Sequence, residues 1–138
     1  MPTAAYNKFH SFAEAVAEKK HNLGADTITV FLTNTAPTAT NAVLADITQI
    51  SYTNLSPRVI TVTTSSQTSG TYRFRASALT LTAGGGSVGP FRYVGLYNDT
   101  ASNDELIGWY DHGESIMMED GDIYIVNFDE NVSILEIA

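Results

Sequence analysis

Residues 85–89 carry the residue pattern of a serine nucleophile. They read Gly-Gly-Ser-Val-Gly, which matches the G-x-S-x-G turn that lifts a serine hydroxyl out of the sheet in α/β-hydrolases. That turn needs a strand before the serine and a helix after it, whereas Pro90 and an aromatic segment follow here. We therefore interpret residues 85–89 as a flexible glycine loop. The loop is not a phosphate-binding P-loop either, because no Gly-Lys-Ser/Thr follows it.

Three neighbouring residues, Asp111, His112 and Ser115, are of the types found in a hydrolase triad. Adjacent residues of a strand point to opposite faces, so Asp111 could not orient His112 as a triad requires. We interpret His112 as an ordinary turn histidine. His10 and His21 lie at the two ends of a predicted helix, which is not a metal-ligand spacing. The sequence therefore predicts no catalytic residues, no cofactor and no zinc site.

Acidic residues gather in two predicted turns near the C-terminus. Carboxylate oxygens are the ligands that calcium prefers, but the spacing is not that of an EF-hand, and acidic β-turns are common. No metal site is predicted, and whether these turns bind calcium stays open. The residues concerned are Glu119, Asp120, Asp122, Asp129 and Glu130.

Aromatic side chains are the candidate interaction surface. Tyr and Trp combine a large apolar area with a polar tip and are enriched at protein interfaces. Packing in the core is the alternative for the same side chains, because spacing alone does not decide which of them face outward. The candidates are Phe91, Tyr93, Tyr97, Trp109, Tyr110, Phe9 and Phe12.

A predicted hairpin organises the elements that would position these residues. Residues 91–97 and 106–110 are rich in aromatic and β-branched residues, which favour strands, and the polar residues 98–104 between them favour a turn. Alternation puts two apolar sets on opposite faces of the first strand, so both faces must be covered. One set is Val94 and Leu96, and the other is Phe91, Tyr93 and Tyr97.

A helix is predicted over residues 7–23. Its apolar residues recur at helical spacing, cations occupy its last turn, and Gly24 provides a left-handed stop. The apolar face must pack on the sheet or on a neighbouring subunit, and we favour the sheet. The stripe consists of Phe9, Phe12, Ala13 and Val16.

The remaining chain shows short alternating segments with polar connections, such as residues 65–70, and one helical turn within residues 44–50. The fold class predicted is mainly β: a single-domain β-sandwich or jelly-roll-like barrel with one N-terminal amphipathic helix. We expect one domain over residues 1–138, with residues 1–24 as arm and helix and residues 25–138 as the sandwich. Further strands are predicted at residues 26–34, 59–64, 71–76, around 79–81, and at 116–118, 123–128 and 132–137. The core should include Val94, Leu96, Ile107, Ile125 and Val126.

Charge is unevenly distributed along the 138 residues, whose formal net charge is −8. Residues 1–90 hold six Lys/Arg and four Asp/Glu, whereas residues 91–138 hold one basic and eleven acidic residues. Such a balance disfavours nucleic-acid binding and leaves open acidic turns or an acidic face that meets a basic partner. Cysteine is absent, so there are no disulfides. No segment predicts membrane insertion, and we expect a soluble protein.

The run YVGLYNDTASNDELIGWYDHGESI, followed by a DGD turn and a terminal SILEIA, resembles a recurring virion protein of tailed phages. In that group a strand of the form Y-x-x-L-Y-N-D-T leads into L-I-G-W/Y-x-D-x-G. The opening helix and the strand near FLTNTAPTATN are also similar to it. The likeness covers both ends and the central hairpin, and much less of residues 47–86. The family resembled is that of the small capsid cement, or decoration, proteins.

The resemblance implies a structural, non-enzymatic protein on the outer capsid surface of the virion, assembled in the host cytoplasm. Its implied partners are the major capsid protein and further copies of itself, as a homodimer or homotrimer, with no nucleic acid and no membrane. Two other functions remain open: a tail or fibre-tip module, and a carbohydrate-binding β-sandwich with Trp109 and tyrosines as a stacking platform. A hydrolase has only the serine motif in its favour.

Overall fold

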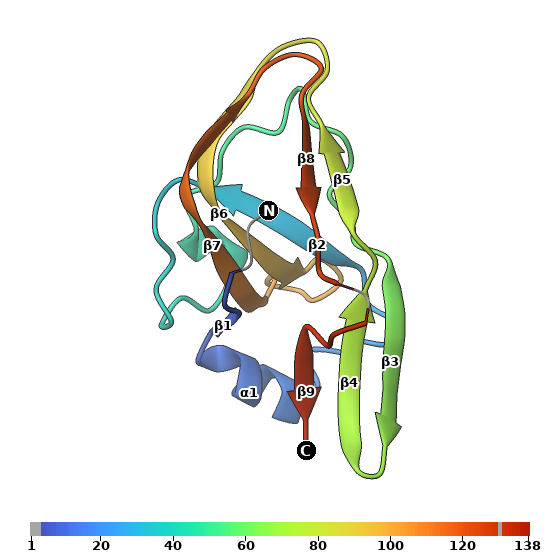
Figure 1. The fold of residues 1–138 in the computed structure, drawn as a ribbon. Helices are drawn as coiled ribbons and strands as arrows, with labels where there is room; N and C mark the ends of the chain where they lie inside the picture. Colours follow the sequence, from blue (N-terminus) through green and yellow to red (C-terminus); the bar gives the residue numbers. More distant parts are fainter. Residues whose placement is uncertain (1–3, 130) are drawn as a thin grey trace.

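The predicted central hairpin is the longest element of the computed structural model, which describes residues 4–129 and 131–138. Its strands are β6 (Val88–Asn98) and β7 (Leu106–Met118), and they pair antiparallel. With β1 (Asn7–Lys8) and β2 (Ile28–Thr33) they form a four-stranded sheet in the order β1-β7-β6-β2 (Figure 1). Residues 116–118, predicted as a separate strand, are the end of β7.

Two smaller antiparallel sheets complete the fold. One consists of β3 (Val62–Thr68), β4 (Thr71–Ala76) and β9 (Leu135–Ile137), and the other of β5 (Leu79–Thr82) and β8 (Ile123–Val126). Figure 1 shows β5 and β8 beyond the ends of β4 and β9, so that the two small sheets line one side of the core. The mainly-β, β-sandwich-like fold with one short helix is therefore confirmed.

The main core lies between the four-stranded sheet and the two smaller ones. Val94, Leu96, Ile107 and Val126 are buried in it, as predicted. The prediction for Ile125 was wrong, because its side chain is 47% exposed. Successive residues of β8 alternate, so Tyr124 and Val126 face the core while Ile125 faces outward.

The opposite face of the four-stranded sheet is also covered, as the two apolar faces of the hairpin required. A second cluster consists of Phe9, Phe31, Ile47, Tyr97 and Leu106, with Leu44 and Trp109 packed against it. Its cover includes the 3-10 turn η1 (Leu44–Asp46), in the region where a helical turn was predicted. Phe91 belongs to the main core instead, because the β6–β7 register shifts between Phe91 and Tyr93 and changes the alternation.

Two glycines of the hairpin allow aromatic rings to lie against its backbone. A Cβ on Gly95 would come within 1.9 Å of the Phe31 ring, and one on Gly108 within 2.3 Å of the Tyr6 ring. Phe31 belongs to the second cluster, whereas Tyr6 packs on the main core. Gly95 and Gly108 thus admit one ring on each face of the hairpin.

The N-terminal helix is shorter than predicted. The structure has α1 at Ser11–Ala17 rather than over residues 7–23, because Asn7–Lys8 pair with β7 as β1. After the helix, Lys19 takes the left-handed conformation that was expected of Gly24. Phe12 packs in the main core of its own chain, which agrees with a helix packed on its own sheet. Ala13 is exposed, and Ala15 is buried instead.

Two further strand boundaries differ from the prediction. Residues 65–68, predicted to lie in a connection, extend β3, and the turn is confined to Ser69 and Gly70. β9 begins at Leu135, later than the predicted start at residue 132. In the described residues, no helix has the length and apolar character needed to cross a membrane.

Candidate interaction surface

Five of the seven aromatic candidates are buried inside this chain. Phe9, Phe12, Phe91, Tyr97 and Tyr110 are each at most 8% exposed. The prediction that these five side chains form an interaction surface was wrong, because each face of the central sheet has its own apolar cluster, which they fill. Only Tyr93 and Trp109 are partly exposed. An aromatic surface built from all seven side chains is therefore not available to a partner in this fold.

The two partly exposed aromatics are each held by a neighbour. The Trp109 ring lies 4.6 Å from the Phe9 ring, centroid to centroid. The Arg92 guanidinium lies 5.4 Å from the centre of the Tyr93 ring and binds Asp111 through two hydrogen bonds of 2.8 and 3.1 Å. The hydrogen bond from Arg92 lowers the pKa of Asp111. Tyr93 therefore lies beside a formed ion pair.

The residues that resembled a triad have separate partners. Asp111 pairs with Arg92, the His112 Nδ1 atom lies 3.0 Å from the Tyr124 hydroxyl, and the Ser115 hydroxyl donates to Asn34 Oδ1 at 2.8 Å. Burial raises the pKa of Tyr124 to about 12 and lowers the pKa of His112. Asp111, His112 and Ser115 therefore do not form a hydrogen-bonded catalytic triad.

Ser87 is exposed and is followed directly by β6. A strand therefore follows the G-x-S-x-G serine where a nucleophile turn would have a helix. The Asp120 carboxylate accepts a hydrogen bond of 2.9 Å from the Gly85 amide, so the acidic turn helps to hold the glycine loop.

The acidic turns use several of their carboxylates to bind backbone amides. Asp122 Oδ2 accepts from the Glu119 amide at 2.8 Å, and Asp129 Oδ1 accepts from the Asn131 amide at 3.2 Å. Across residues 4–129 and 131–138, no three His, Asp or Glu side chains are placed to hold a metal ion together. Glu130, one of the calcium candidates, lies outside the described residues.

A different apolar surface is exposed on the two-stranded sheet. Ile123 is 62% exposed and Ile125 is 47% exposed. Across the sheet they pair with Thr82 and Thr80, which are also exposed. We call this surface, together with the outward side of β4, the outer face. Its residues are Arg73, Arg75, Thr80, Thr82, Ile123 and Ile125.

Sequence reasoning placed both Ile125 and Val126 in the core, although neighbouring residues of one strand point to opposite faces. The alternation of Ile123 and Ile125 against Tyr124 and Val126 was the signal that could have separated an outward pair from an inward pair. The sequence did not show that no described residue covers the outward side of β5 and β8, because this depends on how the sheets assemble.

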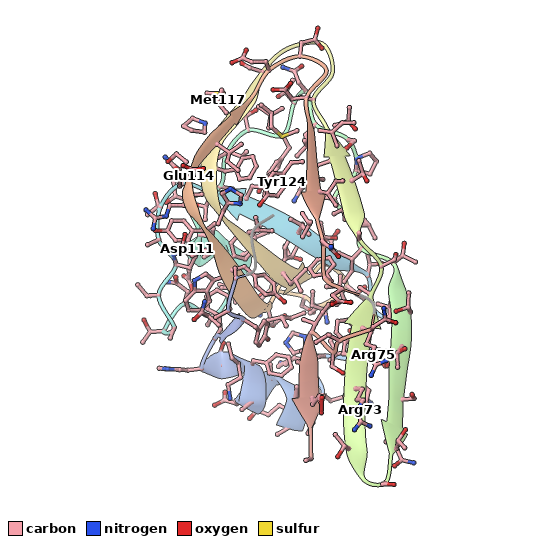
Figure 2. All side chains as sticks on the ribbon, viewed as in Figure 1. Arg73, Arg75, Asp111, Glu114, Met117 and Tyr124 are labelled. Carbon is pink, nitrogen blue, oxygen red and sulfur yellow. The ribbon has the colours of Figure 1, made fainter. Side chains whose placement is uncertain are left out.

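Positive and negative residues lie at opposite ends of the outer face. Arg73 and Arg75 are on β4 (Figure 2), where Arg73 lies 3.9 Å from Glu136 and Arg75 Nε donates to Ser133 Oγ at 3.4 Å. At the other end, the turn before β8 carries the exposed residues Glu119, Asp120 and Asp122.

A buried polar cluster lies near the end of β6, behind an open pocket of about 380 Å³. Asn98 is fully buried, and its Nδ2 atom lies 2.7 Å from Asp26 Oδ2 and 3.0 Å from His21 Nδ1. Glu105 lines the pocket, and its Oε2 atom is buried without a hydrogen-bond partner among residues 4–129 and 131–138. Asn98 lies in the segment that the sequence predicts to be a turn, whereas it is the last residue of β6, so sequence reasoning does not find this cluster.

The fold and the outer face place the chain in the class of small, mainly-β, sandwich-like proteins with an exposed apolar sheet surface. A scan against protein-family models, a search of curated proteins and a search of solved structures found no match to this chain.

Proposed function

We propose that this chain is a non-enzymatic cement subunit of a tailed-phage capsid, which binds the assembled major-capsid lattice and stabilises the head. The observation that carries the proposal is the sequence resemblance of the central hairpin and both ends to capsid cement proteins. Large exposed apolar side chains on one sheet face, here Ile123 and Ile125, are typical of surfaces that bind another protein chain, which supports a subunit that assembles with other chains.

The mechanism would be multivalent binding, in which many weak contacts are repeated over the symmetric shell. A subunit that touches two neighbouring capsid subunits gains affinity, since the second contact becomes intramolecular. Binding to the assembled shell but not to free capsid subunits stabilises the shell by mass action. A packed β domain suits this function because little conformational entropy is lost when it binds.

The buried aromatics reduce the case for carbohydrate binding. A stacking platform of Trp109 with tyrosines cannot use Tyr97 or Tyr110, because both are buried. Trp109 itself packs against Phe9. A tail or fibre-tip module is the alternative outcome of the experiment.

The test compares virions with and without the protein. Particles that lack it should form with normal geometry but release their DNA at a lower temperature. Purified protein added back should restore the release temperature and saturate at a whole-number ratio to capsomers. Ile125→Ser protein should restore it less well than the matched surface variant Lys8→Ser. Electron-microscopic density only at the tail, or unchanged release with failed adsorption to cells, would contradict the cement function and favour the tail module.

A further inference from the structure

The outer face carries two exposed isoleucines on a sheet surface that no described residue covers. The inward residues of β4, β5 and β8 fill the main core, so their neighbours in sequence face outward. On the outward side, the cross-strand pairs Thr82–Ile123 and Thr80–Ile125 are exposed. Antiparallel sheets that face water on one side normally carry polar residues there. Two β-branched apolar side chains in this position are therefore a candidate contact for another protein surface.

The charges around this surface are complementary within one chain. Arg73 and Arg75 lie at its β4 end, and the acidic turn of Glu119, Asp120 and Asp122 lies at its β8 end. Thr82, the neighbour of Ile123, lies seven positions after Arg75, and at about 3.3 Å per residue the two ends are at most roughly 23 Å apart. The isoleucines lie between them.

We propose that two copies of this chain pack their outer faces against each other about a two-fold axis. In a two-fold interface both copies use the same surface. If residue i of the first copy contacts residue j of the second, then residue j of the first copy also contacts residue i of the second. An antiparallel arrangement puts Arg75 of each copy near the acidic turn of the other. It also buries Ile123 and Ile125 between two sheets, which pack at about 10 Å.

The charge pattern favours a second copy over a different partner. A surface with arginines at one end and carboxylates at the other becomes complementary to itself when it is rotated by a half-turn, whereas a parallel arrangement would put like charges together. Arg73 is partly neutralised by Glu136 at 3.9 Å, so Arg75 contributes more of the attraction. This dimer involves the chain alone and can be tested without the capsid; in it the isoleucines join the two copies, and the surfaces outside the outer face remain for the shell.

Sedimentation of the purified full chain over a range of concentrations tests the interface. The wild type should pass from monomer to dimer as concentration rises, with a weaker dimer at high salt because the end charges are screened. The dimer of the double variant Ile123→Ser/Ile125→Ser should have a dissociation constant at least ten times higher than that of the wild type. Its circular dichroism and melting temperature should stay close to those of the wild type.

Charge reversal then tests the arrangement. Glu119 is the better acidic target, because Asp120 and Asp122 hold turn amides. Arg75→Glu and Glu119→Arg should each weaken the dimer, and the combined variant should restore it. Lys8→Glu, an exposed change on β1, should leave it unaltered.

Several results would overturn the proposal. These are a chain that stays monomeric up to several hundred micromolar, a trimer or larger ring, a dimer insensitive to the isoleucine changes, and a double charge variant that is weaker than either single variant.

Discussion

Asn98 fixes the tautomer of His21. The Asn98 side-chain oxygen accepts hydrogen bonds from the amides of Thr100 and Ala101, at 3.0 and 3.1 Å, so its nitrogen is a donor. That nitrogen lies 3.0 Å from His21 Nδ1, which must therefore accept. The neutral imidazole then carries its proton on Nε2, an atom that is buried without a hydrogen-bond partner in the described chain.

The same arrangement opposes protonation of His21. An imidazolium would carry a proton on Nδ1, directed at the Asn98 amino group, and would lose its acceptor. Burial lowers the pKa of His21, and the charges of Glu105 and Asp26 only partly oppose that effect. The neutral ring is thus the form that this cluster accommodates.

Stability should therefore fall in mildly acidic solution. The ordinary pKa of histidine is 6.5 and the folded value is lower, so between the two the unfolded chain binds a proton that the folded chain does not. The free energy of unfolding should decrease as the pH falls below 6.5 and level off below the folded pKa. Urea denaturation between pH 4.5 and 8 measures this dependence.

His112 contributes in the same pH window, because burial lowers its pKa as well. The comparison is therefore between variants. His21→Gln should reduce the pH dependence, whereas His10→Gln, a change at an exposed side chain, should leave it unchanged. Equal slopes for the wild type and His21→Gln would contradict the role of His21.

Core and outer face should respond differently to truncation. Leu96 is 0% exposed and Ile125 is 47% exposed. Leu96→Ala should therefore cost about 2–5 kcal/mol of unfolding free energy, whereas Ile125→Ala should cost much less. Chemical denaturation at a low protein concentration, where no dimer forms, is the appropriate measurement. A loss below about 0.5 kcal/mol for Leu96→Ala would contradict the core position of β6.

Gly95 should not tolerate a side chain. An alanine Cβ would lie 1.9 Å from the Phe31 ring, and overpacking of this kind costs about 1–3 kcal/mol. Gly84→Ala is the matched control, because no atom lies within 4 Å of the Cβ position there. The two melting temperatures give the comparison, and a neutral Gly95→Ala would mean that Phe31 does not pack on β6.

Ser87→Ala and His112→Ala should leave particle stabilisation intact. Ser87 precedes a strand, and His112 contacts Tyr124 rather than Asp111 or Ser115. Thermal release of DNA from particles carrying each variant measures this. A specific loss of stabilisation by either variant, with an unchanged melting temperature of the isolated protein, would contradict the non-enzymatic proposal.

Local patterns predicted the strands better than they predicted what covers them. The alternation around Val94 and Leu96 placed both residues in the core correctly, because a strand with a regular register keeps its faces. Phe91 went to the other face because a register shift in β6 breaks that alternation. A bulge depends on the opposite strand, so the residues around Phe91 do not show it.

The helix and the aromatic surface were harder to predict, because they too depend on residues that are distant in the sequence. Phe9 and Phe12 have helical spacing, yet they fill different clusters. The pairing of Asn7 and Lys8 with β7 prevents the helix from starting earlier. Such long-range pairing is decided by the partner strand, and so is the burial of Tyr97 and Tyr110. The outward position of Ile125 likewise follows from sheet assembly rather than from composition.

The N-terminal segment should act as part of the fold and not as a detachable arm. Phe9 is 0% exposed in the second cluster, where its ring packs on Trp109, and Phe12 lies in the main core. Phe9→Ala should cost about 3–5 kcal/mol of unfolding free energy, and the exposed neighbour change Lys8→Ala should cost little. Deleting residues 1–23 would remove both phenylalanines, so the truncated chain should lose its cooperative thermal transition even as an isolated monomer. A truncated chain that melts like the wild type and fails only in binding to shells would show instead that this segment is an arm for a neighbouring subunit.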